Sequence, residues 1–470
     1  MRFVSRARIV RAIGVTCLCC LFATAPAAAQ IAAESEPNNT ESAADGPVGS
    51  GVRVSGSMSS RRDIDWYSFD VAGPTTIAIS LGHATGRDFD WALYTSTGSA
   101  VAQGRSSAIP QAGSYAAPAG GRYLLKVTAH SGSGAYTLDV TYGSGGGGGG
   151  SDPRPAQPAN LSNWITGNAA NAARQPLNGP ALLLMGGGVE NDEAFSARAF
   201  PVANGGDVVI LRTSGSDGYN AYLFNLVSGA TRPDSVETLL LDTRAKADSD
   251  YAEWVVRNAE LVFIAGGDQS AYLNAWAGTR TQSALRAAYA RGAVVGGTSA
   301  GLAVLGEFIY DPDGVAAVTS AEAIANPYRA GMQFSGTLLD APLANDVITD
   351  SHFAQRDRMG RLLAFMARLR QDGAARVLGI GVDETTSLFI DRTGLGVADG
   401  DGAVYVVEER SDTQRAQVAP GLPLVYRNLR RTKLVAGQGF DFNDGVSTGT
   451  TTVISVDGRN ATPLSPGNPY

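Results

Sequence analysis

Cysteine is almost absent from this 470-residue sequence, because its only three cysteines, Cys17, Cys19 and Cys20, all lie within the first twenty residues. The rest of the chain therefore offers no disulfide, no thiolate metal site and no cysteine nucleophile. Histidine is equally scarce, with three residues in the whole chain. We expect no hydrolytic zinc site, because such sites depend mainly on these two residue types.

Basic residues are also in the minority, since 37 Lys and Arg against 44 Asp and Glu give a formal net charge of −7. This balance argues against nucleic acid as a partner, because phosphate binding needs clustered basic side chains. After the first thirty residues no apolar run is long enough to cross a membrane, so we expect no stable membrane insertion. The length predicts two to three folded domains of about 100–200 residues each.

The first 29 residues have the organisation of a secretory signal peptide. Four arginines precede an apolar stretch over residues 12–25, and Ala27-Ala28-Ala29 supplies the small residues of a cleavage site. We therefore predict a secreted protein, periplasmic or extracellular. Cleavage would remove all three cysteines and make the mature chain more acidic.

Residues 30–142 alternate apolar and polar side chains with a period of two, as in Tyr67, Phe69 and Val71. Clusters of Gly, Pro and Asp separate these runs, and no stretch has the 3.6-residue period of a helix. The pattern predicts an antiparallel β-sandwich or jelly roll. A linker rich in Gly and then Pro is expected over residues 143–160.

Two acidic pairs recur in the sandwich segment, in Asp63-Ile64-Asp65-Trp66 and Asp88-Phe89-Asp90-Trp91. Turn formation by Asp is the favoured interpretation, and a calcium ion held by carboxylate oxygens is the alternative. Together with Glu36-Pro37-Asn38-Asn39-Thr40, the segment resembles the bacterial pre-peptidase accessory domain. The resemblance implies a module that accompanies secreted peptidases and carries no catalytic residue.

Residues 161–470 change to short, continuously apolar strands that alternate with helices. The strands expected are Ala181–Met185, Val208–Leu211, Val236–Leu241, Leu261–Ala265, Ala293–Val295 and Val377–Val382, and the helices include Tyr251–Asn258, Ser283–Arg291 and Arg356–Arg370. This order predicts an α/β fold with a three-layer, doubly wound, mostly parallel sheet. Ligands bind such a sheet at the carboxyl ends of its strands. Residues 385–470 are expected to extend the sheet or to form a small β-appendage.

One of these strands leads into Gly297-Thr298-Ser299-Ala300-Gly301, which has the G-x-S-x-G pattern of a nucleophile elbow. The glycines allow a sharp strand-to-helix turn that exposes the serine hydroxyl. A serine nucleophile needs a base, and His352 is the only histidine of this segment. Asp350, Asp383 and Glu384 are candidates for the carboxylate that fixes its tautomer.

The order of these residues bears on the type of hydrolase. An α/β-hydrolase runs serine, acid, histidine, so Glu322 or Asp340 would have to supply the acid before His352. We keep such an esterase as an alternative. A non-catalytic secreted binding protein, with the sandwich as its working part, is a third interpretation.

The second segment resembles the cyanophycinases and the related dipeptidase peptidase E. The matching pieces, in the family's order, are Gly186-Gly187-Gly188, Gly266-Gly267-Asp268-Gln269, Gly297–Gly301, Asp350–Phe353 with Arg356, Arg358, Arg361 and Leu362, and Gly381–Glu384. The resemblance implies a serine peptidase with a class I glutamine-amidotransferase-like fold and no cofactor. It implies Ser299 as nucleophile, His352 as base and Glu384 as the orienting acid.

By the same resemblance, the N–H groups of Gly267 and Ala300 form an oxyanion hole. The residues that would line the substrate pocket are Gln269, Asp350, Arg356 and Arg361. The implied substrate is cyanophycin, an arginine-bearing polyaspartate that is hydrolysed to β-aspartyl-arginine. A β-linked aspartate presents a free carboxylate that arginine can bind bidentately.

Two departures from the family keep the substrate open. Ser351 stands where cyanophycinases that act on the polymer typically carry glutamine. In addition, the polymer is normally an intracellular granule, whereas we expect this chain to be exported. A shorter aspartyl or isoaspartyl peptide is therefore an alternative substrate, and a homodimer is one assembly that the sequence leaves open.

Overall fold

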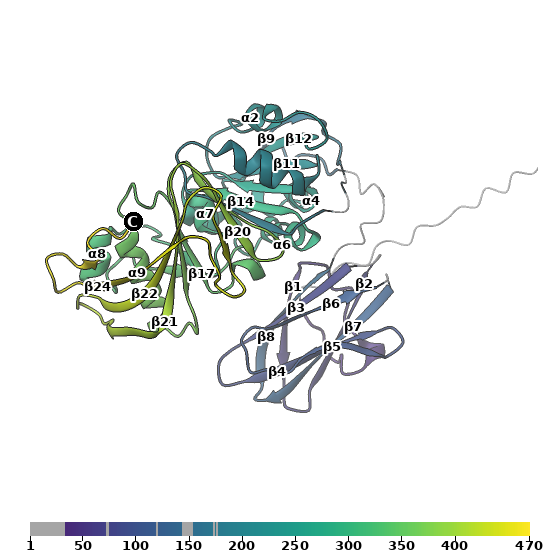
Figure 1. Cartoon of the computed structure of the whole chain (residues 1–470). Coiled ribbons are helices and arrows are strands. Elements are labelled where there is room, and N and C mark those ends of the chain that lie inside the picture. The colour runs from purple at the N-terminus through teal and green to yellow at the C-terminus, as the bar shows by residue number, and fades with distance from the viewer. Residues whose placement is uncertain (1–32, 72–74, 119–120, 143–153, 173, 175–176) are drawn as a thin grey trace, which may run out of the picture.

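The computed structural model describes residues 33–71, 75–118, 121–142, 154–172, 174 and 177–470 (Figure 1). The predicted signal peptide and residues 143–153 of the predicted linker lie outside the described residues. Within the described ranges, no helix combines the length and apolar character that crossing a membrane requires. The fold is mixed α/β with a β-rich N-terminal domain, as predicted.

Two four-stranded antiparallel sheets form the N-terminal sandwich, in the orders β1-β8-β3-β6 and β2-β7-β4-β5. The elements are η1 (Glu41–Ala43), β1 (Arg53–Met58), β2 (Ile64–Val71), β3 (Thr75–His83), β4 (Asp88–Thr95), β5 (Ala100–Gly104), β6 (Gln111–Ala117), β7 (Gly121–Ser131) and β8 (Gly134–Tyr142). Alternate side chains meet between the sheets, and Tyr67, Phe69 and Leu125 are fully buried there. The period-two pattern of the sequence reflects this one-sided burial.

A nine-stranded sheet follows, in the order β23-β20-β19-β10-β14-β13-β11-β12-β9. Its strands are β9 (Ser162–Gly167), β10 (Ala181–Met185), β11 (Asp207–Arg212), β12 (Ser235–Leu240), β13 (Leu261–Ile264), β14 (Val294–Thr298), β19 (Thr386–Ile390), β20 (Leu395–Gly400) and β23 (Gly439–Asp441). The five central strands are β10, β14, β13, β11 and β12, and each pairs in parallel with the next. The flanking strands pair antiparallel, so the sheet is mixed.

Side chains of the central strands alternate between two apolar clusters. Leu182 and Leu184 of β10 join one cluster with helices α4, α5 and α6, whereas Leu183 joins the other with η2, α1 and α2. The helices of this region are η2 (Ala194–Ala199), α1 (Phe200–Ala203), α2 (Asn220–Asn225), α3 (Arg244–Ala247), α4 (Asp250–Asn258), α5 (Gln269–Trp276), α6 (Arg280–Arg291) and α7 (Ala300–Ala303). Burial on both faces explains why these strands read as continuous apolar runs.

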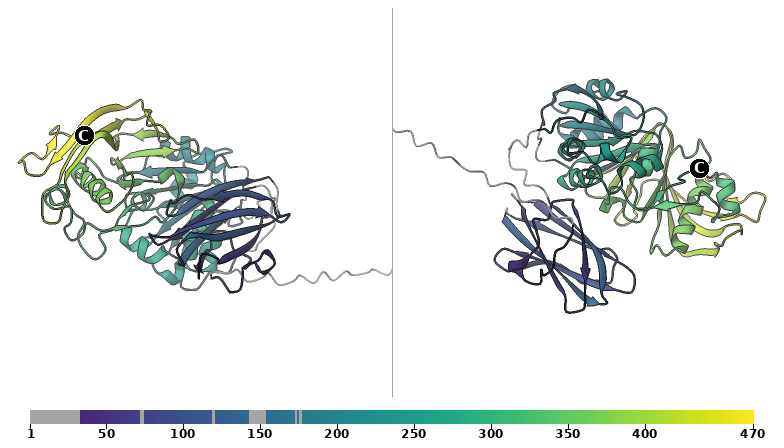
Figure 2. Two further views of the ribbon diagram at one scale, coloured as in Figure 1. Left: turned by 90° about the horizontal axis from the view of Figure 1, so that it is seen from below. Right: turned by 180° about the vertical axis from the view of Figure 1, so that it is seen from behind.

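A separate sheet has six strands, in the order β17-β18-β21-β22-β24-β25. One of them was predicted from the sequence to belong to the parallel sheet, and that prediction was wrong. That strand, β18 (Leu378–Val382), pairs in parallel with β17 (Val347–Asp350) and antiparallel with β21 (Val404–Gln417). The remaining elements are β15 (Ile309–Tyr310), α8 (Ser320–Ala325), β16 (Phe334–Ser335), η3 (Pro342–Ala344), α9 (Met359–Gln371), β22 (Val425–Leu434), β24 (Thr450–Asp457) and β25 (Leu464–Ser465). In both views of Figure 2 the six-stranded sheet, in green and yellow, lies apart from the sandwich, in purple and blue.

Candidate active site

The turn from β14 to α7 holds Ser299 in a strained conformation. Its backbone has φ 55° and ψ −116°, and its N–H donates to the carbonyl of Met185 at 3.1 Å. A Cβ on Gly297 would lie 2.4 Å from the backbone of Gly301, and one on Gly301 would lie 2.1 Å from the Ile264 carbonyl oxygen. Only glycine therefore fits at both positions, and this is the physical basis of the G-x-S-x-G pattern.

His352 follows the end of β17 and also has a left-handed backbone, with φ 46°. Its N–H donates to the Gly186 carbonyl at 2.7 Å, which fixes the residue against the end of β10. The imidazole Nε2 lies 2.8 Å from Ser299 Oγ. The two residues, 53 positions apart in the sequence, are within hydrogen-bonding distance.

Glu384 is the carboxylate at the imidazole, with Oε1 2.5 Å from His352 Nδ1. Asp383 turns the other way and accepts hydrogen bonds from the N–H groups of Ala354 and Ala403, at 2.8 and 3.0 Å. Gln355 was not predicted as a site residue, yet its Oε1 accepts the Glu384 N–H at 3.0 Å.

The acids that an α/β-hydrolase order would require have other roles. Glu322 caps the N-terminus of α8, where its carboxylate accepts hydrogen bonds from the N–H and hydroxyl of Thr319. Asp340 is exposed. These contacts give the esterase alternative no support.

The glycine run after β10 surrounds the imidazole and its carboxylate. A Cβ on Gly187, where φ is +96°, would lie 2.4 Å from His352 Cε1, and one on Gly188 would lie 3.1 Å from Glu384 Cβ. The Gly187 carbonyl also accepts the N–H of Thr385 at 2.9 Å. The close approach of this run to His352 is the physical reason for its glycines, which in the sequence stand only as one piece of the family resemblance.

Replacing Gly187 with alanine should lower kcat by about 100-fold, because a displacement of about 1 Å at a catalytic group can have that effect. The new methyl group would collide with the His352 ring. Steady-state kinetics on a peptide substrate would measure the loss. Gly229→Ala is the matched control, since Gly229 has φ +86° with open space around its Cβ position. Equal losses in both variants would mean that backbone strain, not the collision, is responsible.

The predicted oxyanion donors lie at the ends of adjacent strands. Gly266, after β13, is next to Ser299, since a Cβ there would lie 3.5 Å from Ser299 Cβ. Gly267 has no room for a side chain, because its Cβ would lie 2.3 Å from Tyr272 Oη. Ala300 is the first residue of α7, so its N–H has no partner inside that helix.

The pKa of His352 is held below its ordinary value. Burial of the ring is the main cause, and the positive charges of Arg356 and Arg358 act in the same direction, while the hydrogen bond to Glu384 opposes them. The imidazole is therefore neutral at neutral pH and able to accept a proton.

Replacing Arg356 with glutamine should raise the pKa of His352, because it removes one of the charges that lower it. Activity requires the neutral imidazole and falls as pH drops through this pKa. The acid limb of the kcat/KM profile should therefore move to higher pH in the variant. Arg392→Gln, at an exposed arginine on the β19–β20 turn, is the control. An unchanged acid limb in the Arg356 variant would contradict this account.

Two of the four predicted pocket residues form an ion pair with each other. Asp350 and Arg361 are 3% and 5% exposed, and their bidentate ion pair has N–O distances of 2.7 and 2.6 Å. Arg358 also reaches Asp350 Oδ1, at 3.1 Å. In contrast, Arg356 is exposed beside His352, and Gln269 is half-buried at the N-terminus of α5. Of the four, Arg356 is the exposed one, whereas Gln269 is partly accessible and its Nε2 donates to the Tyr310 carbonyl at 3.3 Å.

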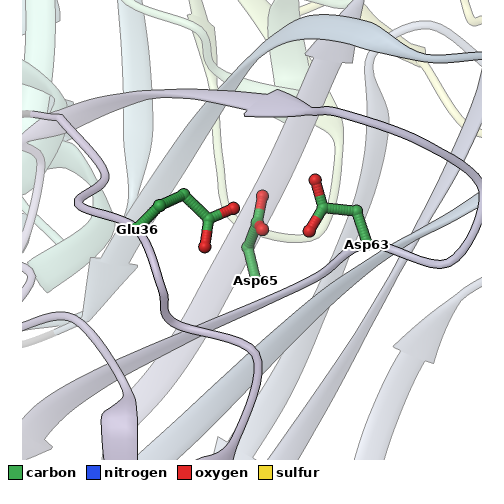
Figure 3. A group of neighbouring side chains, drawn as sticks. All are labelled: Glu36, Asp63 and Asp65. Atoms are coloured by element: carbon green, nitrogen blue, oxygen red, sulfur yellow. The ribbon is translucent and has the colours of Figure 1, made fainter.

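The sandwich brings Asp63 and Asp65 together with Glu36, which sequence analysis did not count as a ligand (Figure 3). One oxygen from each carboxylate lies within 4.8 Å of the others, and within the described part of the chain the group includes neither Asp88 nor Asp90. Asp65 is fully buried, and its Oδ1 has no hydrogen-bond partner among the described residues. Burial and neighbouring carboxylates raise the pKa of Asp65 well above its ordinary value.

Comparisons with known proteins match both parts of the chain. The model of peptidase family S51 matches residues 235–395, and that of the bacterial pre-peptidase C-terminal domain matches residues 63–129. The chain is 33% identical to a cyanophycinase of Geminocystis herdmanii, over 43% of this chain and 70% of that protein. It is 31% identical to a cyanophycinase of a Nostoc species, over 44% of this chain and 65% of that protein. The crystal structure of a peptidase from an acI-B1 actinobacterium is 18% identical, covers 56% of this chain and 97% of its own, and has a TM-score of 0.39.

Proposed function

This chain belongs to peptidase family S51 and is a serine-type peptidase of the cyanophycinase type, and from that premise we propose that Ser299, His352 and Glu384 form its catalytic triad. One observation carries the proposal: the atoms Ser299 Oγ, His352 Nε2, His352 Nδ1 and Glu384 Oε1 form a continuous series with contacts of 2.8 and 2.5 Å. Nucleophile, base and orienting acid are joined in this way in serine hydrolases of unrelated folds.

The proposed reaction follows from these contacts. Ser299 Oγ attacks the scissile carbonyl as His352 Nε2 takes its proton, and Glu384 stabilises the imidazolium that forms. The N–H groups of Gly267 and Ala300 donate to the oxyanion. The imidazolium then protonates the leaving amine, and water hydrolyses the acyl-enzyme by the same route in reverse. The lowered pKa of His352 supports the first step, because the base starts neutral.

We propose a substrate with a free carboxylate close to the scissile bond, as in cyanophycin or a shorter aspartyl or isoaspartyl peptide. The exposed guanidinium of Arg356, four residues after His352, supports this choice, because it can bind that carboxylate bidentately. Gln269 would contribute from α5. Cyanophycin is the first candidate because the two relatives are cyanophycinases.

Incubation of the purified chain with cyanophycin, followed by mass spectrometry, tests the substrate. Release of β-aspartyl-arginine by the wild type and none by Ser299→Ala would support both triad and polymer. Product from neither would reject the polymer, and a screen of isoaspartyl and aspartyl dipeptides with the same pair of proteins would then decide the substrate class.

We also propose export and a doubly wound arrangement of the catalytic domain. The charged, apolar and small-residue regions of residues 1–29 support export, as does the match to a pre-peptidase domain. N-terminal sequencing of protein recovered outside the cytoplasm would test it. The alternation of β10 side chains between two helix-containing clusters supports the layering.

A second proposed function, for the sandwich, is binding of one calcium ion by Glu36, Asp63 and Asp65. Three hard oxygen ligands within 4.8 Å of one another suit this ion. The buried Asp65 Oδ1, without a hydrogen-bond partner among the described residues, favours this alternative over turn formation alone. An ion there would supply the missing partner and neutralise the clustered charge.

Isothermal titration calorimetry of the full chain with calcium chloride, after treatment with a chelator, would test this site. We expect one bound ion per chain in the wild type and none in Asp65→Asn. Asp90→Asn should bind as the wild type does, because Asp90 lies outside the group. Absence of binding by the wild type, or equal binding by Asp65→Asn, would reject the site.

A further inference from the structure

Tyr470 lies beyond the residues that match the peptidase family model, yet it contacts the segment that carries His352. Its hydroxyl donates to Asp357 Oδ1 at 2.9 Å and accepts the N–H of Met359 at 3.0 Å. Its ring meets that of Phe353 edge-on, with centroids 5.9 Å apart at 81°. The three contacts join one side chain to both ends of residues 353–359.

A second set of contacts fixes Tyr470 itself to the six-stranded sheet. Its ring packs edge-on against Tyr405 of β21, with centroids 5.7 Å apart at 79°. The preceding carbonyl, of Pro469, accepts a hydrogen bond from Arg431 Nη1 of β22 at 2.7 Å. Tyr470 therefore connects strands β21 and β22 of this sheet to the segment after His352.

That segment has a backbone that needs support. Asp357 has φ 48°, which is strained for a residue other than glycine. The Arg356 N–H donates to the His352 carbonyl at 3.1 Å, and the Arg358 N–H donates to the Phe353 carbonyl at 3.0 Å. Movement at Asp357 would be passed through these bonds to both His352 and Arg356.

We propose that Tyr470 is a positioning residue for the proposed active site: it holds Asp357 in its left-handed conformation and thereby sets the positions of His352 and Arg356. The inference rests on the proposed function, since it assigns Tyr470 a role in the same triad. A purely structural role would make Tyr470 equivalent to any other hydrogen-bonded tyrosine that packs in or against the sheet.

Tyr426 provides that comparison. It is fully buried on β22, and its hydroxyl donates to Glu409 at 2.7 Å, as the Tyr470 hydroxyl donates to Asp357. Tyr470→Phe and Tyr426→Phe each remove one hydroxyl and keep the ring. If both hydroxyls only stabilise the fold, each variant should differ from the wild type in melting temperature alone.

The rate at which a fluorophosphonate probe labels Ser299 in the full chain measures the competence of the Ser299–His352 pair without a peptide substrate. We expect Tyr470→Phe to label about tenfold more slowly than the wild type, because small displacements of the base have large effects. Tyr426→Phe should label at the wild-type rate. Asp357→Ala should slow labelling to a similar degree, and the double variant with Tyr470→Phe should be no slower than either single variant.

A second readout does not depend on catalysis. The chain has three histidines, so the 15N signals of His352 can be identified by the His352→Gln variant and titrated. Tyr470→Phe should change the His352 signals and their midpoint, whereas Tyr426→Phe should not. If the wild type resists the probe, the proposed triad fails and the titration alone decides the role of Tyr470. Wild-type labelling together with wild-type His352 signals in Tyr470→Phe would overturn the inference.

Discussion

Replacement of Ser299 by alanine should reduce peptide hydrolysis by at least about 1,000-fold, because removing a triad nucleophile leaves only oxyanion stabilisation and substrate binding. Ser299 Oγ is the atom aligned with His352 Nε2, and no cysteine outside residues 1–29 could replace it. Product release measured by mass spectrometry, with melting temperature as the check on folding, would show the effect.

Ser270→Ala is the control for this experiment. Ser270 lies on the neighbouring helix α5, and its hydroxyl donates to Asp311 at 2.6 Å instead of facing the imidazole. We expect Ser270→Ala to retain most of the activity. Residual hydrolysis by Ser299→Ala close to the wild-type rate would mean that the nucleophile lies elsewhere.

Replacement of Glu384 by glutamine should reduce kcat by about 100- to 10,000-fold, within the range seen when the orienting carboxylate of a serine triad becomes an amide. The amide has nearly the same shape as the carboxylate. It cannot stabilise the imidazolium by charge, and its NH2 group can favour the wrong tautomer of His352. Steady-state kinetics of the purified variant would measure the change.

Asp383→Asn separates this effect from a structural one. Asp383 is 4% exposed and accepts hydrogen bonds from the N–H groups of Ala354 and Ala403. Its amide variant should therefore have a lower melting temperature, with a smaller effect on kcat. The reverse pattern, with Glu384→Gln active and Asp383→Asn inactive at an unchanged melting temperature, would transfer the orienting role to Asp383.

The two neighbouring acids also show where sequence reasoning about the site stops. Ser299 and His352 could be proposed as nucleophile and base from the sequence, because a strand–turn–helix glycine pattern and a single available histidine leave few other candidates. From the residues alone, Asp350, Asp383 and Glu384 were equivalent candidates, and only the family resemblance selected Glu384. The direction of each side chain depends on the turn after β18, where Thr385 has φ 54°, and no local sequence pattern encodes that turn.

The pairing of buried charges was the other feature that the sequence did not predict. Asp350 and Arg361 were expected in the substrate pocket, but each satisfies the other in the interior. The pair joins the end of β17 to α9. The sequence of a basic helix face does not show whether its arginines contact substrate, solvent or a buried acid. Nothing in the sequence pointed to Tyr470, because its hydrogen-bond partners Asp357 and Met359 are 113 and 111 positions away.

The fold was predictable to the level of its elements. One-sided burial gives the sandwich strands a period of two, and burial on both faces gives the strands from β10 to β14 continuous apolar runs. The sheet to which a strand belongs was not predictable. Leu378–Val382, like Ala181–Met185, has no polar side chain and is buried along its whole length, yet only long-range pairing places it beside β17 and β21.

The left-handed backbones at Ser299, His352 and Thr385 affect how such a chain would evolve after losing its activity. Each position has φ between 46° and 55°, a conformation that costs of order 1–3 kcal/mol for a residue other than glycine. A descendant released from selection for hydrolysis would gain stability by acquiring glycine there. Inactive descendants should therefore lose these residues early and together, and become more heat-stable as they diverge.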